Sequence, residues 1–88
     1  MPRALWDHNR VYSTDGVRRL NSYPEDELRG MLARICGDGR WVEGMERTRP
    51  FKDAADVYGA SERLFERFPD IAADRAAAAR ALEALLRI

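Results

Sequence analysis

The stretch of sequence that decides the fold covers residues 36–51, CGDGRWVEGMERTRPF. It contains the end of one helix, a turn with two glycines, a short helix predicted over 40–48 and a loop that begins at Pro50. The short helix is predicted because Trp41, Val42 and Met45 share one helical face. Pro50 ends it, since the residue before a proline avoids the α region.

Apolar residues recur at helical spacing on both sides of this stretch, over 14–23, 24–36, 53–68 and 71–87. Their predicted inward faces are Val17, Leu20 and Tyr23; Leu28, Met31, Leu32 and Ile35; Val57, Tyr58, Ser61, Leu64, Phe65 and Phe68; and Ile71, Ala78, Leu82, Leu85 and Ile88. No segment alternates with the period of a strand. The sequence therefore predicts an all-α domain of four to five helices over 1–88, with an N-terminal arm over 1–13 and a helical body over 14–88.

The ends of these helices are predicted from their flanking residues. Ser22 is expected to cap the second helix together with Glu25, while Asp53 and Asp70 are expected to cap the last two. Gly37 is expected to end the second helix, since glycine tolerates positive φ there.

Composition excludes several classes of protein. The 88 residues contain 15 Lys and Arg against 15 Asp and Glu, so there is no basic excess of the kind that nucleic-acid binders usually carry. No apolar run is long enough to span a membrane. A single cysteine excludes an internal disulfide, and we expect a cytoplasmic protein. The Ala- and Arg-rich usage is compatible with a bacterial genome of high GC content.

Several short segments, in their order and spacing, resemble the OHCU decarboxylases, which convert 2-oxo-4-hydroxy-4-carboxy-5-ureidoimidazoline to (S)-allantoin in the breakdown of uric acid. The matching residues are Leu20-Asn21, Cys36-Gly37, Arg40-Trp41-Val42-Glu43, Met45 and Arg49-Pro50-Phe51. The resemblance covers residues 17–67, the front half of a domain of that family. It implies a helical and often dimeric fold, purine metabolism, and a carboxy-lyase activity that needs no cofactor.

The resemblance also implies a difference in the chemistry. Residues 68–72, Phe-Pro-Asp-Ile-Ala, resemble the family's His-Pro-Asp-Leu-Ala element, with Phe68 in place of the catalytic histidine. The same residues also fit an ordinary helix end followed by a proline and a cap. The family's later Glu-Ser-x-x-Glu-Gln segment and late arginine have no counterpart among the 88 residues. Phenylalanine cannot transfer a proton. If residues 68–72 correspond to the family's His-Pro-Asp-Leu-Ala element, the catalytic residues of this chain are therefore unknown.

Candidate ligand-binding residues are Arg40, Trp41 and Arg49, although Arg49 is also a candidate to clamp the carboxylate of Glu43 or Glu46. His8 is expected to be exposed on the arm. Cys36 is interpreted as a small buried residue under Trp41 rather than a nucleophile. The residue spacing gives no metal site, and no cofactor is expected.

These observations leave two hypotheses about function. The first is a non-enzymatic binding, oligomerisation or regulatory module built on the OHCU-decarboxylase scaffold. The alternative is a decarboxylase whose active site is shared between subunits or completed by a partner chain. A homodimer through the helix over Ile71–Ile88 is predicted, although the same apolar stripe also fits closure of the core within one chain.

Overall fold

The computed structural model describes residues 15–87, which contain helices and no strand. In chain order they are a helical segment over 15–22, α2 (Glu25–Ile35), α3 (Gly39–Thr48), α4 (Ala54–Arg67), the 3-10 helix η1 (Pro69–Asp74) and α5 (Arg75–Leu86). The prediction of a small all-α domain is confirmed for this part of the chain. The arm over 1–13, with His8, lies outside the described residues, as does Ile88. Between residues 15 and 87 no helix is both long and apolar enough to cross a bilayer.

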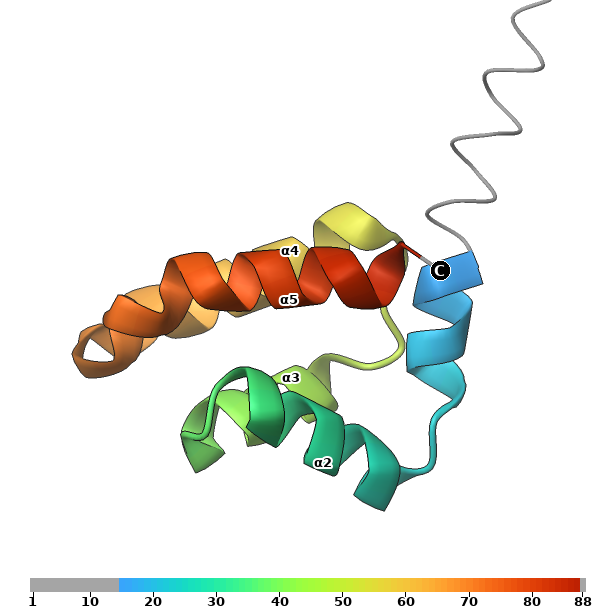
Figure 1. Ribbon diagram of the computed structural model, residues 1–88, viewed down its shortest axis with the longest axis horizontal. Coiled ribbons are helices and arrows are strands. Elements are labelled where there is room, and N and C mark those ends of the chain that lie inside the picture. The colour runs from blue at the N-terminus through green and yellow to red at the C-terminus, as the bar shows by residue number, and fades with distance from the viewer. Residues whose placement is uncertain (1–14, 88) are drawn as a thin grey trace, which may run out of the picture.

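The helices form two pairs, as Figure 1 shows. α4 and α5 run side by side and are joined by η1, while α2 and α3 form the second pair. α3 packs against α4, and α2 packs against α5. The segment over 15–22 lies at the end of α5, where Gly16 comes so close that an added Cβ would overlap the backbone carbonyl of Leu86.

Trp41 is at the centre of the core. It is fully buried, it stacks on Phe65 with ring centroids 6.1 Å apart, and its indole N–H donates to Ser61 Oγ at 3.2 Å. The other buried hydrophobic residues are Val17, Leu20, Leu28, Leu32, Cys36, Val42, Met45, Phe51, Val57, Ala60, Phe65, Ala78, Leu82 and Leu86. The predicted apolar faces supply most of this core.

Two of the predicted capping residues have other partners. Ser22 donates to the carbonyl of Arg19, and α2 begins after Pro24 without a side-chain cap. Asp70 does not cap the last helix, because residues 69–74 form η1 and α5 begins at Arg75. Asp53 is confirmed as the cap of α4, since it accepts from the Asp56 N–H at 2.8 Å.

The turn between α2 and α3 also differs from the prediction. No glycine between residues 15 and 87 has a positive φ, and the chain leaves α2 through an extended Cys36. Asp38 instead starts α3, because its carboxylate accepts from the Arg40 N–H at 2.9 Å. The turn is thus fixed by a side-chain cap on the following helix.

The loop over 49–53 is tied back to the first helical segment by side chains. The Asn21 amide pairs with the backbone of Phe51, donating to its carbonyl at 2.9 Å and accepting from its N–H at 2.8 Å. Arg49 Nη1 donates to the carbonyls of Leu20, Asn21 and Tyr23, the shortest contact being 2.7 Å to Tyr23. Leu20-Asn21 and Arg49-Pro50-Phe51, two separate parts of the resemblance, are therefore joined in space.

Candidate functional site

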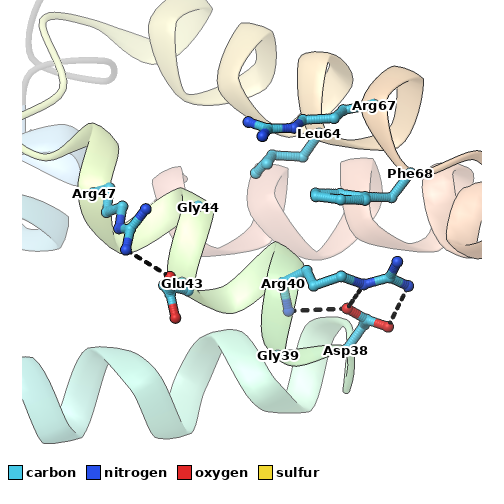
Figure 2. Close-up of a pocket in the computed structure, with 9 residues that line it drawn as sticks. All are labelled: Asp38, Gly39, Arg40, Glu43, Gly44, Arg47, Leu64, Arg67 and Phe68. Carbon is cyan, nitrogen blue, oxygen red and sulfur yellow. Dashed lines mark hydrogen bonds and ion pairs between the residues drawn. The ribbon is translucent and has the colours of Figure 1, made fainter.

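The candidate site is a pocket of about 630 Å³ between α3 and α4. α3 and the turn before it contribute Asp38, Gly39, Arg40, Glu43, Gly44 and Arg47, and α4 with its C-cap contributes Leu64, Arg67 and Phe68. Figure 2 shows Arg40 and Phe68 on facing sides, with Leu64 and Arg67 above them. Its volume falls within the range of small-molecule sites.

Arg40 joins the two sides of the pocket. Its guanidinium donates to both carboxylate oxygens of Asp38 at 2.9 Å, and Nη2 also donates to Asp70 Oδ2 at 2.6 Å. Asp38 belongs to the turn before α3, whereas Asp70 belongs to η1. The arginine therefore holds the start of α3 against the segment that follows Phe68.

Phe68 presents its ring to two guanidinium groups. The Arg40 Cζ lies 4.6 Å from the ring centroid and the Arg67 Cζ lies 5.4 Å from it. Both distances are within the range of cation–π attraction. The position that the resemblance assigns to a catalytic histidine is thus an apolar, half-buried wall of the pocket.

The charges of the pocket are only partly compensated. Arg40 has Asp38 and Asp70, and Arg47 pairs with Glu43 at 2.8 Å. Among residues 15–87, no carboxylate forms an ion pair with Arg67. Arg67 is therefore the pocket arginine whose charge is not neutralised by a carboxylate of the described residues, so it is available to pair with an anionic ligand.

Gly44 shapes the floor between the two helices. A Cβ added there would lie 2.5 Å from Leu64 Cδ2, so only glycine lets the Leu64 side chain reach this position without displacement. This contact lies where α3 packs against α4.

The two carboxyl groups beside Arg40, of Asp38 and Asp70, are ionised at neutral pH, and their pKa values are lowered. The hydrogen bonds from Arg40 lower the pKa of Asp38 to about 2 and lower the pKa of Asp70. The same pairs raise the pKa of Arg40. None of these three groups exchanges a proton near neutral pH, so they can attract or orient a ligand but cannot act as general acids there.

The structure separates the three candidate residues predicted from the sequence. Arg40 lines the pocket. Trp41 is fully buried with its N–H bound to Ser61, so it supports the site from inside the core without facing a ligand. Arg49 follows the far end of α3, about 15 Å along the helix, and binds backbone carbonyls instead of a carboxylate.

The sequence reasoning missed Arg67 and Asp38, which line the pocket, and Asp70, which lies outside the lining and binds Arg40. Arg67 belongs to a run in which Arg63 and Arg67 alternate with glutamates, a pattern typical of a solvated helix face. Its position directly before Phe68 was the available signal. Asp70 is separated from Arg40 by 30 residues, and nothing in local spacing predicts that pair.

Cys36 is buried in the structure. Burial raises the pKa of the Cys36 thiol, whose S–H donates to Asp74 Oδ2 at 3.8 Å. This agrees with a buried structural residue, because the thiolate needed for nucleophilic attack is disfavoured.

The described part of the chain contains no group of three or more His, Cys, Asp or Glu side chains that could hold a metal ion.

Comparison with protein-family models, with curated proteins and with solved structures gives no match for this chain.

Proposed function

We propose that this protein is a non-enzymatic binding module, built on an OHCU-decarboxylase-like scaffold, that holds a small carboxylate in the pocket between α3 and α4. The observation that carries the proposal is the placement of Arg67 and the Phe68 ring in one pocket, 5.4 Å apart, with no carboxylate paired to Arg67 among the described residues.

The pocket supports a ligand with two parts. A carboxylate would accept hydrogen bonds from the Arg67 guanidinium, which is a planar donor suited to such a group. A flat apolar part would rest on Phe68 and Leu64. Arg40 is held by two carboxylates, so it contributes mainly to the shape of the pocket and to the cation–π contact.

The chemistry of the lining supports binding without catalysis. Its side chains are arginines, carboxylates, Leu64 and Phe68, and the carboxyl groups of Asp38 and nearby Asp70 stay ionised well below neutral pH. If Phe68 occupies the place of the family's histidine, the pocket keeps the position and loses the proton-transfer group.

The resemblance is part of this proposal. Asn21 and Arg49 lie in separate segments of the resemblance, and both fasten the first helical segment to the loop after α3. Purine metabolism, a bacterial source, a cytoplasmic location and a homodimer belong to the same proposal as predictions.

Binding is tested by calorimetric titration with benzoate, a planar carboxylate, and with its neutral analogue benzamide. We expect benzoate to bind and benzamide to bind at least about tenfold more weakly, because a charge-assisted hydrogen bond is lost. Arg67→Gln should weaken benzoate binding by a similar factor. Arg63→Gln, which removes an exposed arginine of α4 outside the pocket, should leave it unchanged. Equal binding of benzoate by the Arg67→Gln variant would contradict the proposal.

Catalysis is tested separately with freshly generated OHCU. Micromolar protein is added and the appearance of (S)-allantoin is followed by circular dichroism. We expect the spontaneous rate with and without protein. An accelerated decay that depends on protein concentration would overturn the non-enzymatic assignment and support the decarboxylase alternative with a site shared between subunits.

A further inference from the structure

A second groove lies on the opposite side of α3, between α2 and α3, and encloses about 330 Å³. Its lining includes Arg29 and Ala33 from α2, Gly37 from the turn, and Glu43 and Glu46 from α3. Within the described part of the chain, Arg67 gives the α3/α4 pocket a cation without an ion-pair partner, whereas the unmatched group in this groove is a carboxylate oxygen.

Glu46 is the residue that points to a ligand. Its side chain is only 9% exposed, and its Oε2 is buried without a hydrogen-bond partner among residues 15–87. Its other oxygen, Oε1, accepts both hydrogen bonds from Arg29, from Nε at 3.2 Å and from Nη2 at 3.1 Å. A buried carboxylate oxygen without a donor is energetically unfavourable, and a donor from a ligand would relieve that cost.

Arg29 can move aside for such a ligand. Its side chain is 60% exposed, and it has a second partner in Glu25 at 3.6 Å. Leaving Glu46 would therefore keep one ionic contact for Arg29 while freeing Oε1. A planar guanidinium from a ligand would then reach both oxygens, which a carboxylate accepts in a fork-like pairing.

We propose that the α2/α3 groove binds a guanidinium group, which pairs with the buried Glu46 carboxylate and is also attracted by Glu43. Gly39 and Glu43 line both this groove and the carboxylate pocket, but Glu46 lines only the groove, and Arg67 and Phe68 line only the pocket, so either proposal can fail without the other.

The test is a titration of ¹⁵N-labelled protein with methylguanidinium chloride at constant ionic strength, followed by NMR at the amides of Ala33 and Gly37. These two residues line the α2/α3 groove and not the α3/α4 pocket. We expect saturable shifts with methylguanidinium and none with N-methylurea, a neutral molecule of nearly the same shape. A capped Gly-Arg-Gly peptide is titrated in parallel. Tighter binding of the peptide would identify an arginine side chain of a protein as the natural source, and tighter binding of methylguanidinium would identify a free small molecule.

Two variants move the affinity in opposite directions. Glu46→Gln should weaken binding at least about tenfold, because it removes the charge and keeps the shape. Arg29→Ala should strengthen binding several-fold, because it removes the competing guanidinium. Glu83→Gln, on α5, should have no effect. The proposal is overturned if neither probe gives saturable shifts with wild-type protein, if Glu46→Gln binds as tightly as wild type, or if Arg29→Ala weakens binding.

Discussion

At the scale of single residues, the hydrogen bond between Trp41 and Ser61 is a polar contact buried in the core. Both residues are buried, and the Trp41 indole N–H has Ser61 Oγ as its acceptor at 3.2 Å. We expect Ser61→Ala to reduce the free energy of unfolding by about 1–3 kcal/mol, since it leaves a buried donor unsatisfied. Chemical denaturation followed by tryptophan fluorescence measures this change.

The matched control is Ser22→Ala, which removes a hydroxyl that donates to a carbonyl at an exposed position. We expect a change within about 0.5 kcal/mol. Equal effects of the two substitutions would show that the Trp41 contact does not matter for stability.

The Asp38 carboxyl group makes the stability of the folded protein depend on pH. Its pKa is about 2 in the folded protein against 3.8 for the free side chain, because Arg40 hydrogen-bonds its carboxylate. Since the folded value is the lower one, the stabilisation is complete above about pH 4 and is lost as the pH falls from about 4 to 2.

NMR titration of the Asp38 side chain checks this value. Acid unfolding of Asp38→Asn should lack the part of the pH dependence between 4 and 2 that comes from this group. A measured pKa near 3.8 would contradict the Arg40 contact.

Residue-level reasoning from the sequence predicts burial better than it predicts partners. Trp41, Val42 and Met45 were expected on one inward face and all three are buried. The partners of Arg40 and Arg49 were not predicted, because they depend on which segments meet in space. Asp70 and the carbonyl of Tyr23 are 30 and 26 residues away from their respective arginines.

At the scale of elements, Gly16 lies at a close contact between two helices, whereas Gly30 lies on an open helix surface. A Cβ on Gly16 would overlap the backbone carbonyl of Leu86, whereas a Cβ on Gly30, in the exposed face of α2, would meet nothing within 4 Å. We expect Gly16→Ala to destabilise the protein by about 1–3 kcal/mol. Gly30→Ala should stabilise it by about 0.5–1 kcal/mol through the higher helix propensity of alanine.

Thermal unfolding of the two variants gives the comparison. The packing of the 15–22 segment on α5 would be wrong if both substitutions raised the melting temperature.

Helix positions were predictable from periodicity, but several helix ends were not. The final helix was expected from Ile71, yet η1 occupies residues 69–74 before α5 begins at Arg75. Alanine-rich sequence favours a helix throughout this region and cannot distinguish its first turns from a 3-10 helix. The Asp70 carboxylate, expected to cap the helix, is held by Arg40 instead.

At the scale of the whole molecule, Ala78, Leu82 and Leu86 of α5 are buried and close the core within the chain. Beside this buried stripe, Ala81, Ala84 and Leu85 line a groove of about 410 Å³ with Met31 and Ile35 of α2. The homodimer stays a prediction, and a dimer through α5 would use this groove.

Light scattering coupled to size exclusion tests the dimer at micromolar concentration. We expect twice the chain mass of 10.1 kDa for the wild type and the monomer mass for Ala84→Glu. Ala79→Glu places the same charge at an exposed α5 position outside the groove and should remain dimeric. A monomeric wild type would contradict the prediction.

The α3/α4 pocket could not be assembled from the sequence, because it joins α3 and the turn before it to the end of α4. From the sequence, Arg40 was predicted to bind a ligand, and the resemblance singled out Phe68. Folding adds Arg67 to them and places Gly44 against the Leu64 side chain.

The most direct test of the central claim is where benzoate binds on ¹⁵N-labelled protein. We predict saturable amide shifts at Gly44, Arg67 and Phe68, which line the α3/α4 pocket, and none at Gly30 on the exposed face of α2. The absence of saturable shifts, or shifts confined to Met31 and Leu85 in the α2/α5 groove, would contradict the assignment of the α3/α4 pocket as the ligand site.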